Sequence, residues 1–303
     1  MSEELMARAL STNAYTLAGG TGAAGTLNPT LWVPEVERFA KAATVVAPLG
    51  VVRNDILGKA GEAFNIVFDS EITVAALTET TAITPSALSY TKITLTPTEY
   101  GGGFAITRKE RIRAITDVIA DKVRDLGYAF AKKRDQVILA ELVASAGNSV
   151  VANGVAVSAI ASSDTLDTDD IANAVTELRV DDEVAKYLVI HPKCENSLIK
   201  LSDFVDASVY GGREVLMNGE IGKYLGLRVL VSTLVSRNAT TSTAFDNFVL
   251  GDRAFVFAPK MPVTIDMDYK VLEREYVVAA VEEYDVSALR VNAICKLTAY
   301  GGA

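Results

Sequence analysis

Very few residues in this sequence could supply catalytic or metal-binding chemistry. Among its 303 residues there is one histidine, His191, and there are two cysteines, Cys194 and Cys295. A histidine-based triad would have to use His191, and a zinc ion held by His191 and Cys194 would need two more ligands. Only the distant Cys295 or carboxylates could supply them. We therefore predict no catalytic residue, no metal and no cofactor, and a structural His191 that is hydrogen-bonded to a nearby carbonyl.

The sequence also lacks the features of an exported or membrane-inserted chain. Two cysteines could form one disulfide, but two free, buried thiols in a reducing compartment are the favoured interpretation. No apolar run approaches the roughly 20 residues of a membrane-spanning helix, and the richest run, 276–281, has the length of a strand. The first ten residues contain Glu3, Glu4 and Arg8 and no apolar core of a secretory signal. We expect a soluble chain made in a cytoplasm.

Positive charge is in deficit. The chain has 29 lysines and arginines against 38 aspartates and glutamates, which gives a net charge of −9. Tight nucleic-acid binding depends on clustered lysine and arginine, so direct binding of this kind is disfavoured. A surface that only tolerates nearby DNA remains compatible with the composition.

One segment imitates a nucleotide-binding motif. Gly20–Gly25 fits G-x-G-x-x-G, a pattern that functions only between a strand and a helix, with an acidic residue about twenty positions later. Here Asn28 and Pro29 follow, and the later region is Val45–Ala47. A flexible glycine-rich arm is the better interpretation of residues 1–30. A segment of this composition needs a partner to become ordered, and a neighbouring copy of the chain is the simplest one.

An extended hairpin is predicted next. Phe64, Ile66 and Phe68 alternate with more polar residues and form one apolar strand face, and Tyr90 to Thr98 returns as a threonine-rich strand. The tip, residues 70–89, is long, and the glycines 101–103 separate the hairpin from the element that follows. The apolar face has no evident local partner. The residues predicted to contact other copies of the chain are Trp32, Phe64, Ile66, Phe68, Tyr90, Ile93 and Leu95.

A long helix should follow the hairpin. Thr107 and Glu110 have the spacing of a capping box, and apolar residues then recur mostly every three or four positions on a charged background. The pattern predicts one helix of about forty residues and roughly 55–60 Å, ended by Gly147 and Asn148 as a left-handed C-terminal signal. Its predicted core face consists of Ile112, Ile115, Ile119, Val123, Leu126 and Phe130.

The order of elements resembles the major capsid proteins of tailed bacteriophages, the HK-97-type shell fold. Short helices and strands alternate after the long helix, and strands return at the end, which predicts an α+β protein. The local similarities lie in Lys186–Pro192, Gly219–Val229 and Phe248–Asp252, and the resemblance covers nearly the whole chain. It implies an N-terminal arm (1–56), an extended β-hairpin loop (57–104), a peripheral domain with a spine helix and flanking β-strands (105–150 and 260–303) and an α/β axial domain (151–259).

The same resemblance implies a structural function. Proteins of this family self-assemble as hexamers and pentamers into an icosahedral shell around a double-stranded DNA genome, without sequence-specific binding and without a membrane. The implied partners are a separate scaffolding protein, a portal and cement proteins. The implied location is the host cytoplasm before assembly and the virion capsid after it. No enzymatic activity is expected.

Two other classes of protein are left open by the sequence. An encapsulin-like nanocompartment shell, which encloses enzymes instead of a genome, would share the fold. A nucleotide-binding metabolic enzyme that uses Gly20–Gly25 is the less favoured alternative.

Overall fold

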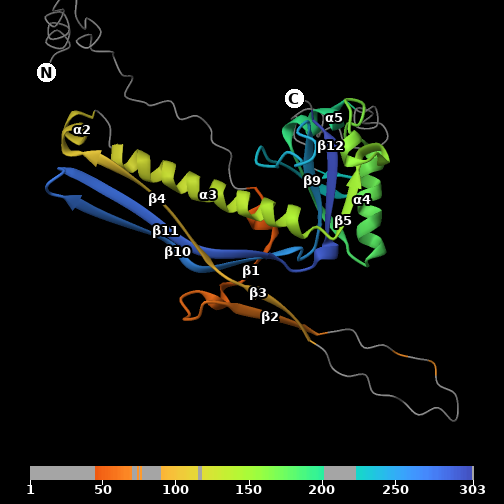
Figure 1. Cartoon of the computed structure of the whole chain (residues 1–303), viewed down its shortest axis with the longest axis horizontal. Helices are drawn as coiled ribbons and strands as arrows, with labels where there is room; N and C mark the ends of the chain where they lie inside the picture. Colours follow the sequence, from red (N-terminus) through yellow and green to blue (C-terminus); the bar gives the residue numbers. More distant parts are fainter. Residues whose placement is uncertain are drawn as a thin grey trace, which may run out of the picture. The chain divides into compact units, whose positions relative to one another are not determined.

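The computed structural model describes residues 45–69, 74, 76, 90–114, 118–200 and 223–301 (Figure 1). The chain divides into two units, Met1–Ala40 and Lys41–Ala303, and all described residues lie in the second. The predictions for Trp32, Ile115 and the glycine-rich motif therefore concern positions outside the described residues, as does most of the hairpin tip.

A four-stranded sheet is built around one long hairpin. Its strands are β1 (Val51–Val52), β4 (Thr98–Thr107), β10 (Phe255–Lys270) and β11 (Glu275–Ala288). In the order β1-β10-β11-β4, β11 pairs antiparallel with both β10 and β4, and β1 pairs parallel with the first residues of β10. Two 3-10 turns flank β1, namely η1 (Ala47–Leu49) and η2 (Asn54–Ile56).

A six-stranded sheet holds most of the core. Its strands, in sheet order, are β5 (Asn148–Val151), β12 (Ile294–Tyr300), β9 (Ala244–Gly251), β6 (Ala185–Ile190), β8 (Leu227–Val231) and β7 (Lys223–Tyr224). All eight residues of β9 are buried, as expected for a central strand. The helices are α4 (Thr168–Val180), which starts at an Asp167–Asp170 capping box, and α5 (Pro192–Ile199). Short 3-10 turns occupy η3 (Ala152–Gly154), η4 (Val157–Ala159) and η5 (Val291–Ala293).

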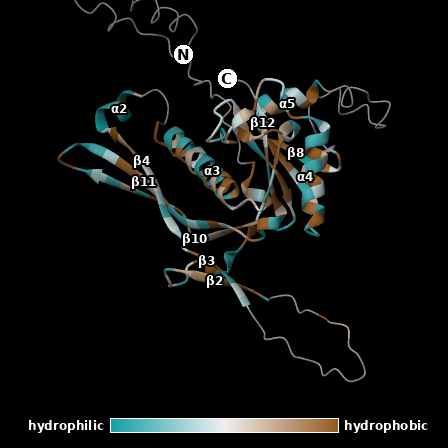
Figure 2. Ribbon diagram, turned by 45° about the vertical axis from the view of Figure 1, so that its right-hand side comes forward, coloured by the Kyte–Doolittle hydropathy of each residue, from teal (hydrophilic) through white to brown (hydrophobic). Residues whose placement is uncertain are grey.

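The helix α3 (Val118–Ser145) contacts both of these sheets. It touches β4 and β11 of the first and β12 of the second. Its buried apolar residues Ile138, Leu139 and Leu142 belong to one continuous core that includes residues of β11 and β12. Hydrophobic residues, drawn brown, are frequent in this part of the ribbon (Figure 2). The predicted α+β class is confirmed.

The hairpin begins where the sequence predicts it. The strands β2 (Phe64–Asp69) and β3 (Tyr90–Leu95) form a separate antiparallel pair. Phe64 lies opposite Leu95, Ile66 opposite Ile93, and Phe68 opposite Thr91, so the apolar residues share one face.

The predicted forty-residue helix is wrong, because the chain forms two helices. Thr107 and Glu110 do form the capping box, but they start the six-residue helix α2 (Arg108–Arg113). Ala114 has an extended conformation with ψ 136°, so the helix cannot continue. The 28-residue helix α3 starts at Val118 and spans roughly 42 Å. In the sequence, Thr116 and Asp117 precede it, and both are residue types that favour helix starts.

Two predictions about glycines are also wrong. Gly102 and Gly103 lie inside β4 instead of separating elements, and a Cβ on them would lie 3.1 Å from Leu126 Cδ1 and 2.6 Å from Val278 O. The small residues let α3 and β11 approach β4. Gly147 follows α3 as predicted but not in the left-handed conformation, since the glycines with positive φ among the described residues are others. A Cβ on Gly147 would lie 2.6 Å from Val291 O.

The two sheets divide the chain differently from the predicted domains. β12 lies in the six-stranded sheet, although residues 260–303 were assigned to the spine-helix domain, and β5 joins it there. Residues 98–104 belong to the four-stranded sheet and not to the hairpin loop. These differences arise because long-range strand pairing decides which sheet a strand enters, and a local pattern does not contain it.

Candidate functional site

The residues with catalytic potential are structural. His191 caps α5, where its Nδ1 accepts a hydrogen bond from the Lys193 amide at 3.2 Å, and its ring stacks on Phe245 with 3.8 Å between centroids. The predicted carbonyl partner was wrong, because the ring accepts from an amide. Burial, helped by the positive charges of Lys193 and Arg237, lowers the pKa of His191. Cys194 and Cys295 are free and buried as predicted, and burial raises the pKa of both, that of Cys295 to about 12.

Neither a metal cluster nor a membrane span emerges from the described part of the chain. It contains no group of three or more histidine, cysteine, aspartate or glutamate side chains placed to hold a metal ion. None of its helices is both long and apolar enough to cross a membrane.

A first set of contacts fixes the start of the described chain on α3. Asp135 is completely buried, and its carboxylate accepts hydrogen bonds from the backbone amides of Val45 at 2.7 Å, Val46 at 3.4 Å and Ala47 at 3.0 Å. The side chain of Val46 is buried in the main core. Residues 45–47 are thus held on α3 by one carboxylate and one apolar side chain.

A second set of contacts fixes the base of the β2–β3 hairpin. Leu95, only 1% exposed, packs with Ile56, Val256 and Ala258 in a small cluster of their own. Beside it, the amide of Thr96 donates a 2.6 Å hydrogen bond to Asp285 on β11. The prediction that Leu95 contacts another copy is therefore wrong, because its own chain buries it.

The other residues predicted to contact neighbouring copies differ in how deeply they are buried within their own subunit. Phe64 and Ile66 are half-buried and pack against the Leu95 cluster. Phe68 and Ile93 are half-buried farther along the same face, and Tyr90 is exposed. Contact of these residues with other copies stays a prediction, and it applies best to the outer half of the hairpin.

The contact between α3 and the four-stranded sheet contains a buried ion pair. Glu282 on β11 is almost fully buried, and its Oε2 accepts hydrogen bonds from both Nε and a terminal nitrogen of Arg134, the former at 2.8 Å. Tyr284 stacks on Tyr100 with 4.6 Å between ring centroids, and burial raises the pKa of its hydroxyl. Within the described part of the chain, Glu282 Oε1 and the Tyr284 hydroxyl have no hydrogen-bond partner.

Only some of the residues predicted for the core face of the long helix lie on α3. Phe130 is buried, and Ile119, Val123 and Leu126 are half-buried. Ile112 is 72% exposed on α2, so its assignment to a core face is wrong within this chain. The break at Ala114 removes it from the α3 stripe.

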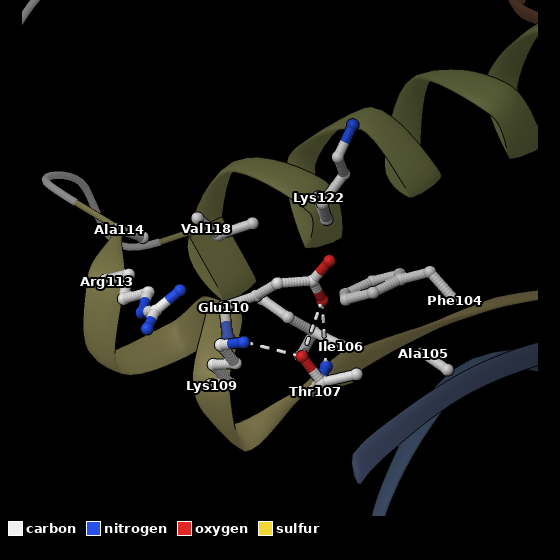
Figure 3. A pocket seen from close by; sticks show the side chains of 10 residues that line it. All are labelled: Phe104, Ala105, Ile106, Thr107, Lys109, Glu110, Arg113, Ala114, Val118 and Lys122. Carbon is white, nitrogen blue, oxygen red and sulfur yellow. Dashed lines mark hydrogen bonds between the residues drawn. The ribbon is translucent and has the colours of Figure 1, made fainter. Parts of the chain in front are cut away.

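Sequence patterns did not predict a pocket or the exposed turn between β10 and β11. The pocket lies between β4, α2 and the start of α3 and has a volume of about 740 Å³ (Figure 3). The turn between β10 and β11 carries Val271 and Leu272, both highly exposed. The four basic residues among the six of α2 are a sequence signal that could have indicated a charged surface here.

Comparison with known proteins identifies the fold. A family model described as phage capsid protein matches residues 89–292. A solved structure from Mycobacterium phage Che8 is 20% identical, with a TM-score of 0.71 over 90% of this chain and 97% of that one. The cyanophage Pam1 capsid is 14% identical, with a TM-score of 0.73 over 94% and 100%. The capsid of Helicobacter pylori bacteriophage KHP30 is 13% identical, with a TM-score of 0.70 over 93% and 98%.

A search of curated proteins finds no match to the sequence. The structural similarities, at 20% identity or less, establish the fold, and the family model, which covers two thirds of the chain, establishes the family. The predicted resemblance is confirmed. This chain belongs to the phage capsid protein family.

Proposed function

We propose that this capsid protein assembles through hexamers and pentamers into an icosahedral shell around a double-stranded DNA genome. The observation that carries the proposal is the hairpin β2–β3. Leu95 and Asp285 hold its base in the subunit, while its apolar face continues outward to Phe68, with Tyr90 exposed on the opposite face. A neighbouring subunit is the natural cover for the outer half, because apolar surface is stabilised when it leaves water.

The charge of the chain fits the enclosure of DNA without tight binding. A net charge of −9 disfavours persistent phosphate contacts, so an acidic inner wall would let packaged DNA slide. The protein would act in the virion after assembly in the host cytoplasm, with no enzymatic role of its own. A separate scaffolding protein, a portal and cement proteins would be its other partners.

Replacement of Phe68 by aspartate tests the role of the hairpin. Phe68 is a better site than Phe64, because Phe64 packs on the subunit's own cluster and its replacement would disturb the fold. The Phe68→Asp variant should stay folded by circular dichroism but should fail to form particles in electron microscopy and size-exclusion chromatography. Asn65→Asp is the matched control, since Asn65 lies on the opposite, exposed face of β2. Particle yields equal to wild type for Phe68→Asp would contradict the proposed role.

The cargo of the particles tests the rest of the proposal. Particles made in the presence of the complete set of phage proteins should protect DNA from nuclease. Particles that enclose protein and exclude DNA would instead identify a nanocompartment shell.

A further inference from the structure

The pocket beside α2 combines an apolar lining with positive charge. Phe104, Ile106 and Val118 contribute apolar side chains from β4 and α3, and Lys109 and Arg113 contribute cations from α2 (Figure 3). Ile106 is buried beneath the opening. A cavity of this kind fits a segment that carries both exposed aliphatic side chains and carboxylates.

The cations of the pocket are available for an external partner. Neither Lys109 nor Arg113 makes an ion pair with any of the residues that the structure describes. The carboxylate of Glu110 is occupied by the Thr107 amide and hydroxyl, at 3.0 and 2.9 Å. The helix α2 as a whole carries four cations and only this one carboxylate.

The end of the β10–β11 hairpin has the complementary composition. Leu272 is 96% exposed and Val271 is 71% exposed. Residues 263–273 carry three carboxylates and one ammonium group, and Glu273 pairs with Lys270 at 3.1 Å, so the acidic character of the segment comes from Asp266 and Asp268. On the outer part of β10, the aliphatic side chains of Val263, Ile265 and Met267 are also exposed. β1 pairs with β10 only at Val256 and Phe257, so among the residues that the structure describes this outer part is a sheet edge.

We propose that residues 263–273 of one copy dock in the β4–α2–α3 pocket of a second copy, with Leu272 against Phe104 and Val118. The inference rests on the proposed shell assembly and names two surfaces that meet in it. Carboxylates of the inserted segment would lie near Lys109 and Arg113, which are complementary to them in charge.

The segment does not fill the pocket of its own chain. The amide of Arg108 donates a 2.9 Å hydrogen bond to the carbonyl of Arg274, so the hairpin end and α2 are fixed side by side within one subunit. In that position Leu272 remains almost fully exposed. Because each copy presents both surfaces at the same end of its sheet, a copy can insert its hairpin end into one neighbour and receive that of another. Contacts of this head-to-tail type close into a ring when the rotation between copies permits.

Cross-linking between two differently tagged chains tests the docking. One full-length chain carries Leu272→Cys, the other carries Val118→Cys, and particles assembled from both are treated with a short bis-maleimide. Cys194 and Cys295 are buried, so they should not react in the folded protein. Because each new thiol is on a different chain, a product that contains both tags arises only between copies. The matched control replaces Leu272→Cys by Val180→Cys, at the exposed last residue of α4.

The expected result is a doubly tagged product from the Leu272→Cys and Val118→Cys pair, well above the Val180→Cys control. The product should be lost when Arg113→Glu and Lys109→Glu are added to the chain that carries Val118→Cys. Normal particles with no cross-link above the control would overturn the docking and leave the proposed function intact. Failure of wild-type chains to form particles at all would instead count against the proposed function, and the docking would fall with it.

Discussion

The carboxylate of Asp135 and the backbone amide of Val45, which lie 90 positions apart in the sequence, are joined by a 2.7 Å hydrogen bond. Asp135 lies in the buried part of α3, and the same side chain also accepts the amide of Ala47. A helical carboxylate that accepts hydrogen bonds from a run of backbone amides holds Val45 to Ala47 on α3.

Replacement of Asp135 by asparagine should destabilise the subunit by about 1.5–3 kcal/mol, because a charged acceptor of buried hydrogen bonds is lost. The free energy of unfolding in urea measures the effect. Asp125→Asn on the same helix is the control, since the 3.8 Å ion pair of Asp125 with Lys122 is exposed to solvent, and its loss should cost less than about 1 kcal/mol. Equal stability of Asp135→Asn and wild type would show that the amides find other acceptors.

Loss of one partner of the Arg134–Glu282 pair should cost more than loss of both. Arg134→Met leaves the buried carboxylate of Glu282 without its cation, which costs about 3 kcal/mol. The double variant Arg134→Met with Glu282→Met removes the stranded charge and should be more stable than Arg134→Met alone. Urea unfolding of the subunit decides between these outcomes.

The exposed pair Lys186–Asp252, with 3.0 Å between its charged atoms, is the matched control. Lys186→Met should cost under about 1 kcal/mol, because exposed ion pairs contribute little. If Arg134→Met costs no more than Lys186→Met, the ion pair does not hold α3 on the sheet.

Local patterns predicted those elements whose signals lie within a few residues. The β2 strand was visible in the alternation of Phe64, Ile66 and Phe68, and the capping box of Thr107 and Glu110 was visible in its spacing. The order of elements carried the family resemblance, which the comparisons confirm. In each case the determining interaction is short-range in sequence.

The features that sequence patterns could not predict depend on contacts between residues far apart in the sequence. The three- and four-residue apolar spacing continues through Ala114, so periodicity alone does not reveal the break that places Ile112 on a separate helix. Leu95 is buried because η2 and β10 meet the hairpin base, and that meeting leaves no local pattern. The pocket and the Leu272 turn likewise become neighbours only through the pairing of β4 with β11.

Stability should depend on pH through Asp170. Burial raises the pKa of this carboxyl to about 6 in the folded protein, above its ordinary value of 3.8. Between these values the folded state binds more protons than the unfolded state, so the contribution of Asp170 to stability falls as pH rises from about 4 to about 6. The difference in unfolding free energy between wild type and Asp170→Asn should therefore shift against wild type over that range. Asp169→Asn, at the exposed neighbouring position, controls for the loss of a carboxylate from the same helix turn. A pH-independent difference would contradict the raised pKa.

Replacement by alanine should destabilise the subunit at Gly147 and stabilise it at Gly127. A Cβ at Gly147 would lie 2.6 Å from the carbonyl oxygen of Val291 and 2.8 Å from its carbon, and both are backbone atoms that cannot rotate away. Gly147→Ala should therefore destabilise the subunit by about 1–3 kcal/mol, the usual cost of overpacking.

Gly127 provides the matched comparison, because it lies inside α3 and a Cβ there would have no heavy atom within 4 Å. Gly127→Ala should stabilise the subunit by about 0.5–1 kcal/mol, since alanine loses less conformational freedom than glycine when it joins a helix. The free energies of unfolding of the two variants and of wild type, measured in urea, test both predictions. An unchanged free energy of unfolding in Gly147→Ala would contradict this argument. It would mean that the backbone between α3 and β5 can move away from Val291 in η5 without destabilising the subunit, so that a glycine is not needed there for the close approach of the two backbones.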